Sequence, residues 1–250
     1  TLYNKLKRID LTCRMRDCDE TEARQIRLAF PMNANFKNVA YEVPFGKVEI
    51  GADEVQPQLA FEVKQTKEYL AKMNDLRRTD LDKWKQWRRS QKGKTPVRPR
   101  EIQNWIYAGD GDAGVTIGSS AIAWDYMDAS AAPVDYPVLQ PVLLCSAYSC
   151  SRWKHCWTQP GDHKFTFSIF SHKGGWRNGY RSGVATNNPL IPVLVKVNPT
   201  GKLPPSKSFL SVSADNVIVT AVKKSEDSND LAVRFYEAEG KPASSVVLTP

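Results

Sequence analysis

The sequence predicts a mainly β protein, built as a sandwich or a barrel, with one helical insertion. Many short runs rich in Val, Ile, Phe and Tyr are separated by turn residues, which is the pattern of an all-β domain. Residues 161–176, GDHKFTFSIFSHKGGW, alternate apolar and polar side chains with the period of two that a half-buried strand requires. Only residues 64–100 carry apolar side chains at the three-to-four spacing of a helix.

The composition is that of a chain that can fold around its own core. Its 250 residues are 41% hydrophobic and 10% aromatic, which excludes a disordered composition. No run approaches the roughly 20 apolar residues that a membrane span needs. The chain begins at Thr1 with neither an initiator Met nor a basic-then-apolar leader, so we expect a fragment of a longer protein.

The first predicted strands precede the insertion. The two β-type runs are RQIRLAFPM and VAYEVPFGKVEI, which are divided at Pro31 and at Pro44. Proline has no backbone N–H to donate to a sheet, so each run is expected to be split at its proline.

The insertion is also the basic part of the chain. Residues 64–100 hold 13 Lys and Arg against 4 Asp and Glu, a net charge of +9, which leaves −1 for the rest of a chain whose total is +8. A nucleic-acid footprint spread over one face of the fold is therefore disfavoured. The spacing predicts a helix over 66–90. Its buried side is expected to hold Met73, Leu76, Leu81, Trp84 and Trp87, with Arg77, Arg78, Arg88 and Arg89 outside.

After the insertion we expect strands and turns throughout. NWIY and VTIGSS flank AGDGDAG, which is a turn and not an EF-hand loop, because Gly114 and Ala121 stand where calcium ligands are required. PVLLCSAY precedes a Trp-rich stretch and the strand that begins at residue 161. A long loop, 172–189, then leads to LIPVLVKV. Residues 208–238 are expected to form adjacent antiparallel strands joined by the turns SADN and SEDSND.

The strand at 161–173 bears on metal binding, because it carries His163 and His172. Residues nine apart on a strand point to opposite faces and lie roughly 30 Å apart, whereas zinc ligands lie about 2 Å from the ion. His155 and Cys156 are neighbours and point apart as well. The sequence therefore predicts no metal site in this chain.

Other chemistry is weakly signalled. There is no Gly-x-Ser-x-Gly elbow, phosphate-binding Gly loop or His-Glu-x-x-His, and no residue is nominated as catalytic. The five cysteines are spaced more widely than the C-x-x-C of a zinc ribbon or redox motif, so their disulfide state and the compartment of the protein stay open. They are Cys13, Cys18, Cys145, Cys150 and Cys156.

Several stretches, taken in order, resemble one family. They are LYNKLKRIDL, RLAFPMNANFKNVAYEVPFGKVE, NWIYAGDGDAGVTIGSS, PGDHKFTFSIFSHKGGW, NNPLIP and SFLSVSADNVIVTAVKKSEDSNDLAVRFYEAEGK. Together they resemble the C-terminal β region of glycoside hydrolase family 38, the α-mannosidases, over most of residues 2–241. The resemblance implies a large two-sheet antiparallel sandwich of the galactose-mutarotase-like type, a supersandwich, with 64–100 as a basic helical insertion.

The resemblance also carries expectations about function. Members of the family are zinc-dependent, retaining enzymes that hydrolyse α-mannosides, with their zinc ligands and Asp nucleophile in an N-terminal α/β domain. Residues 1–250 are then expected to be one non-catalytic C-terminal domain, without a cofactor of its own, that supports and partly walls the active site. The insertion is longer than the usual link in the family, and the chain ends where family members commonly continue.

The loop 172–189 contains residues suited to sugar contact, because flat aromatic faces and N–H donors match sugar C–H edges and hydroxyls. The candidates are His172, Trp176, Arg177, Tyr180 and Arg181. The alternative is that Trp176 packs an end of the sandwich and that the arginines are solvated.

Three functions are therefore in competition. The first is the support of an α-mannosidase, with its own N-terminal catalytic domain and mannose-containing glycans as partners. The second is a free-standing carbohydrate-binding module that uses Trp84, Trp87 or Trp176. The third and least favoured is polyanion or nucleic-acid binding through 64–100. No membrane partner is expected, and the oligomeric state stays open.

Overall fold

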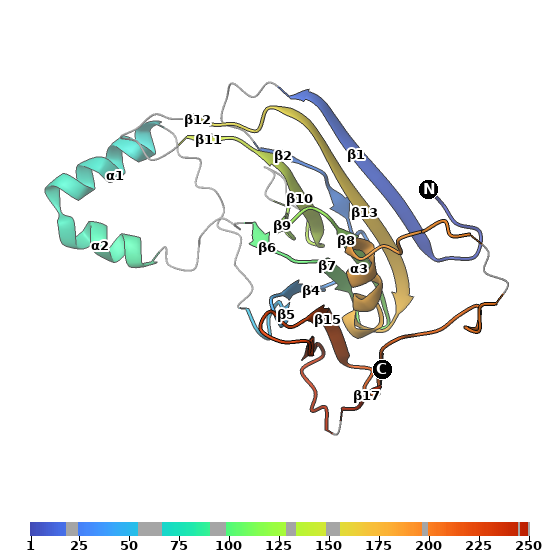
Figure 1. Cartoon of the computed structure of the whole chain (residues 1–250). Coiled ribbons are helices and arrows are strands. Elements are labelled where there is room, and N and C mark those ends of the chain that lie inside the picture. Colours follow the sequence, from blue (N-terminus) through green and yellow to red (C-terminus); the bar gives the residue numbers. More distant parts are fainter. Residues whose placement is uncertain are drawn as a thin grey trace.

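A six-stranded antiparallel sheet, the main sheet, forms the centre of the molecule (Figure 1). The computed structural model describes residues 1–18, 25–54, 67–90, 99–128, 134–148, 156–196, 200–244 and 246–249. The strand order in the main sheet is β1 (Arg8–Cys18), β13 (Gly161–Lys173), β8 (Ala113–Ser119), β7 (Trp105–Gly109), β4 (Asn38–Val43) and β5 (Gly46–Glu49). Strands far apart in sequence are therefore neighbours, as in β1 and β13.

A second antiparallel sheet packs against one face of the main sheet. It consists of β2 (Gln25–Arg27), β10 (Val138–Cys145), β9 (Ala123–Asp125) and β6 (Arg100–Glu101), with β3 (Phe30–Pro31) also paired to β10. Three two-stranded sheets complete the β structure: β11 (Ala147–Tyr148) with β12 (Cys156–Trp157), β14 (Ser211–Val212) with β17 (Leu248–Thr249), and β15 (Val217–Lys224) with β16 (Leu231–Glu237). The predicted class, a mainly β antiparallel sandwich with a helical insertion, is confirmed.

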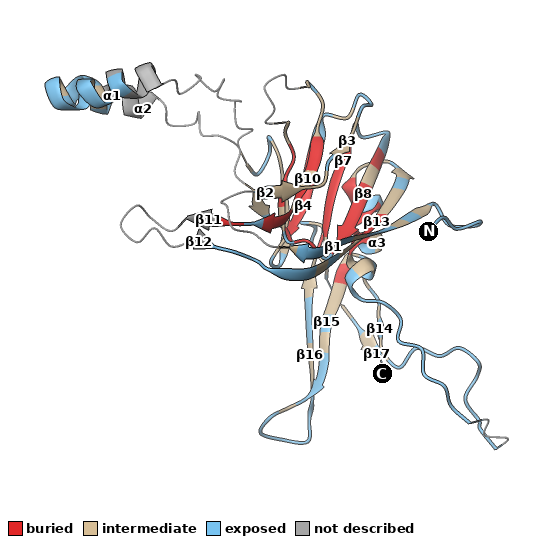
Figure 2. Cartoon of the chain, turned by 90° about the horizontal axis from the view of Figure 1, so that it is seen from above, coloured by how far each residue is buried: buried red, intermediate tan, exposed pale blue. Residues whose placement is uncertain are grey.

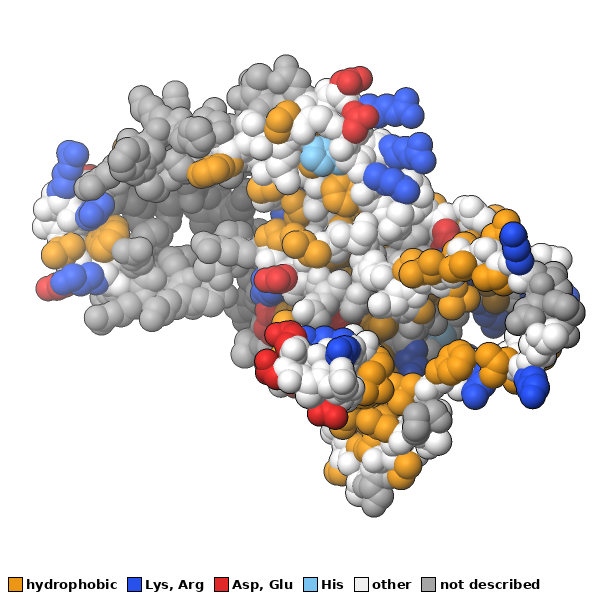
Figure 3. Space-filling view, in the orientation of Figure 1, with side chains coloured by type: hydrophobic (Ala, Val, Ile, Leu, Met, Phe, Trp, Pro, Cys, Tyr) orange, Lys and Arg blue, Asp and Glu red, His pale blue; other side chains and the backbone are white. Residues whose placement is uncertain are grey.

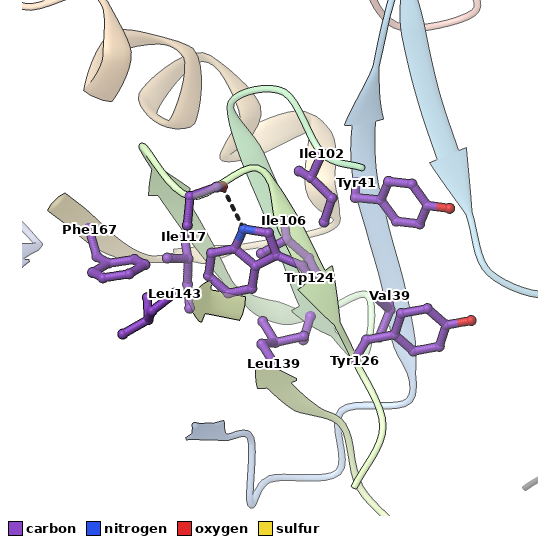
Figure 4. Close-up of a cluster of buried hydrophobic side chains, with 12 residues drawn as sticks. Val39, Tyr41, Ile102, Ile106, Ile117, Trp124, Tyr126, Leu139, Leu143 and Phe167 are labelled. Atoms are coloured by element: carbon purple, nitrogen blue, oxygen red, sulfur yellow. Dashed lines mark hydrogen bonds between the residues drawn. The ribbon is translucent and has the colours of Figure 1, made fainter. Parts of the chain in front are cut away.

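The core lies between the two large sheets. Figure 4 shows Ile106, Ile117 and Phe167 of the main sheet pointing toward Trp124 and Leu139 of the second sheet. The indole N–H of Trp124 is buried, and it donates a hydrogen bond to the backbone oxygen of Ala121 at 2.8 Å. A large aromatic side chain therefore fills the centre of the sandwich without leaving its polar atom unpaired.

Strand β13 has the alternation that the sequence predicts. Phe165, Phe167 and Ile169 face the core of the sandwich. His163 and His172 lie near its two ends, and their parity places them on opposite faces. Their ring nitrogens lie 2.9 Å from the backbone oxygen of Gln159 and 2.9 Å from the hydroxyl of Thr116, respectively.

The turn between β7 and β8 confirms the interpretation of AGDGDAG. Asp110 Oδ1 accepts hydrogen bonds from the backbone N–H groups of Asp112 and Ala113, at 2.9 and 2.8 Å. Gly111 has a φ of +100°, which glycine adopts without steric cost. The acidic side chain therefore closes a tight hairpin turn.

The outer face of the main sheet is covered by helix, where the sequence had predicted a loop. Residues 172–189 contain a short 3₁₀ helix, η1 (Trp176–Asn178), and α3 (Tyr180–Asn187). Figure 2 shows the buried strands of the main sheet beside α3. The expectation of strand and turn throughout is corrected here: the glycines that weaken the helical signal, Gly179 and Gly183, are required for close packing on the sheet.

The basic insertion is helical, but it forms two helices and not one. Its elements are α1 (Lys67–Thr79) and α2 (Leu81–Ser90), which Figure 1 shows away from the large sheets. Asp80 separates them, and its Oδ1 accepts a hydrogen bond from the backbone N–H of Lys83 at 3.0 Å. This is the geometry of an N-cap, so a new helix begins where the apolar spacing alone predicted continuity.

The predicted faces of the insertion are only partly right. Leu76 and Trp84 are half-buried and Arg77 and Arg78 are exposed, as expected. Leu81 is 50% exposed, because it is the first residue of α2, next to the turn between the two helices. It does not lie in the middle of one continuous apolar face. The side chains of four other residues in the prediction lie outside those that the structure describes: Met73, Trp87, Arg88 and Arg89.

The C-terminal strands also differ in part from the prediction. The SEDSND turn joins β15 to β16, with the Ser225 N–H donating to the Asp230 oxygen at 2.8 Å. However, β14 pairs with β17 and not with β15. A bulge shifts the register of the hairpin between Val219 and Ala221. Ile218 and Tyr236, which are paired before the bulge, both pack against the cluster around Trp105 and Trp176. The run LIPVLVKV is not a strand in its described part, 190–196, and its apolar side chains there are exposed.

We predict that Gly183→Ala destabilises the protein by about 2 kcal/mol. A Cβ at Gly183 would overlap Trp105 Cβ and lie 3.0 Å from Trp105 Cγ, so α3 would have to move off the sheet. The loss should exceed the gain in helix propensity, which is about 1 kcal/mol. Urea unfolding of the purified variant measures the effect.

The matched control is Gly175→Ala, since a Cβ there has no heavy atom within 4 Å. Its free energy of unfolding should stay within about 0.5 kcal/mol of the wild type. A Gly183→Ala variant as stable as this control would show that α3 does not pack tightly on β7.

Candidate functional site

Most of the predicted sugar-contact residues lie where η1 and α3 pack on the outer face of the main sheet. We call η1 and α3 the outer cover, and their contact with the sheet the seam. Trp176 stacks on Trp105 of β7, with ring centroids 5.7 Å apart and planes inclined by 12°. The guanidinium of Arg177 lies 4.6 Å from the ring centroid of Trp176. Trp176 is 4% exposed, so its ring packs on the outer face of the main sheet, and not at an end of the sandwich.

Tyr180 and Arg181 join the same seam to the C-terminal hairpin. Tyr180 is 2% exposed, and its hydroxyl donates to Glu239 Oε1 at 3.4 Å. Arg181 donates to the backbone oxygens of Asp215 and Val217, and its guanidinium lies 5.6 Å from the Tyr180 ring centroid. Arg181 therefore connects α3 to the start of β15, and Tyr180 connects it to Glu239, just beyond the end of β16.

His172 is close to the seam but lies in a separate cavity. Its ring stacks on Tyr107 with centroids 5.8 Å apart. The adjoining cavity of about 380 Å³ lies between the N-terminal residues, the end of β13 and α3. It is lined by Leu6, Lys7, Arg8, Phe170, Ser171, His172, Asn178, Ser182 and Ala185. The structure thus brings together four of the five candidates, and sugar contact by all five remains a prediction.

A buried carboxylate holds the seam together. Glu42 of β4 is 3% exposed, and it accepts hydrogen bonds from the Asn104 backbone N–H at 2.9 Å and from the Tyr236 hydroxyl at 3.1 Å. Burial raises the pKa of Glu42 above its ordinary value, although these two donors oppose the shift. Burial of the Tyr236 hydroxyl, together with the nearby Glu42 charge, raises the pKa of Tyr236. Sequence reasoning missed Glu42, because a single Glu inside a β run has no distinguishing pattern.

Ionic groups lie at the solvent edge of the seam. Glu239 Oε2 is 2.9 Å from Lys241 Nζ and 3.7 Å from Arg177 Nε, and the Arg177 guanidinium also donates to the Glu239 backbone oxygen at 3.1 Å. A further ion pair joins Lys47 Nζ to Asp53 Oδ2 at 2.5 Å. The rim of the seam is therefore polar, with charges of both signs.

Two cavities open on either side of Arg177. One, of about 420 Å³, is lined by Phe45, Gly46, Lys47, Asp53, Arg177, Glu237, Ala238, Glu239 and Gly240. The other, of about 500 Å³, is lined by Arg177, Asn178, Asp215, Asn216, Glu239, Lys241 and Pro242. Of these residues only Arg177 was a predicted site residue.

Zinc does not fit the residues that the structure describes. In the described ranges no group of three or more His, Cys, Asp or Glu side chains is placed to hold a metal ion.

Cys13, Cys18 and Cys145 are free thiols, while Cys150 and the Cys156 side chain lie outside the described part. No helix in the described ranges is long and apolar enough to cross a membrane.

We predict that Glu42→Ala lowers the free energy of unfolding by about 3 kcal/mol, because it leaves the Asn104 N–H and the Tyr236 hydroxyl without their acceptor. Glu42→Gln should cost less, since its amide oxygen accepts one bond and its NH₂ can donate to the phenol oxygen. Chemical denaturation of the two variants at pH 7 compares these costs.

The raised pKa of Glu42 also predicts how the difference in stability between Glu42→Gln and the wild type changes with pH. A carboxyl whose pKa is higher in the folded state than its ordinary 4.5 binds protons more tightly when folded, so its contribution to stability falls as the pH rises above about 4. The stability of Glu42→Gln relative to the wild type should therefore rise between pH 4 and pH 7. A relative stability that falls over this range would contradict a raised pKa at Glu42.

Comparison with known proteins extends these observations. Residues 216–250 match the model of the glycosyl hydrolases family 38 C-terminal beta sandwich domain. Alpha-mannosidase G of Dictyostelium discoideum is 32% identical over 82 residues, which are 32% of this chain and 8% of that protein. The matched sequence is therefore a small part of the relative.

Two solved structures share the fold. An alpha-mannosidase from Enterococcus faecalis V583 superposes with a TM-score of 0.63 at 15% identity, over 94% of this chain and 22% of that one. A protein in glycosyl hydrolase family 38 from Enterococcus faecalis gives 0.65 at 13% identity, over 99% of this chain and 24% of that one. The chain thus spans about a quarter of these proteins. In sequence at residues 216–250, and in fold over nearly its whole length, it resembles the C-terminal β-sandwich region of the mannosidase-like proteins of glycosyl hydrolase family 38.

Proposed function

We propose that residues 1–250 are the non-catalytic C-terminal β-sandwich of a retaining, zinc-dependent α-mannosidase. In this proposal a separate N-terminal catalytic region carries the zinc and the nucleophile. The sandwich supports that region, partly walls its active site and contributes to binding of mannose-containing glycans. The likeness to one quarter of two longer proteins, one of them an alpha-mannosidase, supports this division of labour.

The observation that carries the supporting role is an extended apolar segment, 190–195. Its apolar side chains are between 73% and 101% exposed, and Figure 3 shows hydrophobic side chains gathered where the chain leaves α3, on the right of the view. They are Leu190, Ile191, Val193, Leu194 and Val195. Five large apolar side chains in one short segment favour burial against another protein surface. The occupant that we propose is the catalytic region of the same protein.

A second function, carbohydrate binding by the sandwich itself, is favoured by the two polar cavities on either side of Arg177.

The third function, polyanion binding through 64–100, is supported less well. Two of the lysines of the insertion lie in ion pairs with neighbouring carboxylates, Lys83 with Asp80 at 3.0 Å and Lys85 with Asp82 at 3.6 Å. A steep loss of nucleic-acid binding with added salt would be the mark of this third function.

We predict that the isolated chain does not hydrolyse an aryl α-mannoside, with or without added zinc, and does not hold stoichiometric zinc. In this proposal the activated nucleophile and the metal ligands lie outside residues 1–250. Turnover that survives further purification, or zinc bound through His163 or His172, would overturn the proposal. Titration with mannosides, followed by Trp fluorescence, tests the carbohydrate-binding alternative on the same sample.

The coding region upstream of Thr1 provides the positive test. Its product is expected to hydrolyse the aryl α-mannoside in the presence of zinc and to co-purify with this chain. Leu194→Ser should weaken the co-purification, whereas Leu231→Ser, which changes another exposed leucine (62%, against 101% for Leu194) at the start of β16, should not. An upstream region with no mannosidase activity would contradict the proposal.

A further inference from the structure

A single aromatic residue is presented to solvent at the tip of the β4–β5 hairpin. Phe45 is 83% exposed, although most of the large aromatic side chains of the sandwich are buried. Its ring meets Tyr236 edge-on, with centroids 6.3 Å apart and planes inclined by 89°. This contact holds one edge of the ring, and the high exposure of the residue leaves a face available to a ligand.

The backbone of Phe45 is strained as well. The residue has a φ of +64°, a conformation that bulky side chains rarely adopt. It is the second central residue of the two-residue turn from Val43 to Gly46, and Pro44 occupies the first. Glycine is favoured at such a position, because Pro at the first central residue and a positive φ at the second are the features of a type II turn. Phenylalanine here carries costs of strain and of apolar exposure that folding does not require.

Phe45, whose backbone is strained, lines the 420 Å³ cavity described above. The lining of this cavity also holds two ion pairs, Lys47 with Asp53 and Arg177 with Glu239. The second cavity, of about 500 Å³, continues beyond the Arg177–Glu239 pair. Its Asp215 carboxylate has no hydrogen-bond or ion-pair partner in the described part of the chain.

The chemistry of the two cavities indicates a neutral, hydroxyl-rich ligand. Their combined lining holds three cations against four carboxylates, so neither an anion nor a cation is favoured by net charge. These charged residues are Lys47, Arg177, Lys241, Asp53, Asp215, Glu237 and Glu239. Their ion pairs fix donors and acceptors in place, and each carboxylate oxygen can accept more than one bond. An exposed aromatic face beside fixed donors and acceptors suits a pyranose ring, which is apolar on its C–H face and polar at its edge.

We propose that the cavities on either side of Arg177 form a saccharide-binding groove, in which Phe45 stacks on one sugar ring and Asp215 hydrogen-bonds to the next unit. This inference deepens the carbohydrate-binding alternative of the proposed function and rests on it. It assigns the stacking role to Phe45, because the faces of Trp176 are already occupied by Trp105 and Arg177.

The test uses Phe45→Gly, because glycine removes the ring and relieves the backbone strain. The variant should fold at least as stably as the wild type, so a loss of binding cannot be attributed to unfolding. Isothermal titration with an α-linked mannobiose should show binding to the wild-type chain, weakened about tenfold or more in Phe45→Gly. Phe209→Ala is the matched control, since Phe209 is an exposed aromatic outside both cavities, and it should bind as the wild type does.

A second variant tests whether the second sugar unit contacts Asp215. Asp215→Ala should weaken binding of the mannobiose severalfold and leave binding of methyl α-mannoside unchanged, because only a second sugar unit would reach Asp215. Equal losses in Phe45→Gly and Phe209→Ala, or a wild-type chain that binds neither saccharide, would overturn the groove. The mannosidase test of the coding region upstream of Thr1 is independent, so a failure here and a failure of the supporting role are distinguishable.

Discussion

Strand β7 is buried on both of its faces, and the rest of the structure depends on this double burial. Ile106 and Ala108 face the core between the two sheets, while Trp105 and Tyr107 face the outer cover. A strand in the middle of an antiparallel sheet commonly has one solvated face. Here the outer face carries large aromatic rings, which have to be removed from water. The stacking of Trp176 on Trp105 provides that cover, so η1 and α3 are parts of the fold rather than surface decoration.

The same double burial explains where a ligand can bind. Side chains that are chemically suited to sugars, above all Trp176 and Tyr180, are used to close the outer face and are almost completely removed from solvent. Polar groups gather instead at the edge of the closed face, where Arg177 and Glu239 meet water. The two cavities open at this edge because a helix, a hairpin turn and the end of β16 converge there without filling the space.

The sequence predicts the elements whose pattern is local, and β13 is the clearest example, because alternation along one strand is independent of its neighbours. The two helices of the insertion are predicted in extent but not in their division, since the apolar spacing continues across the capping residue Asp80. Helix α3 is not predicted, because its glycines are chosen for contact with the sheet and lower its intrinsic helix propensity. Of the site, residues 172–181 are found by composition, whereas Phe45 and Glu42 acquire meaning only from distant neighbours.

Native-state hydrogen exchange tests the central claim most directly, because it reports whether α3 opens independently of the sheet. If the cover is an integral part of the fold, the most protected amides of α3 and those of β7 exchange through the same global unfolding, with equal free energies and equal sensitivity to denaturant. Amides of α3 that all exchange through a low-energy local opening, while those of β7 stay protected to the global limit, would contradict the account.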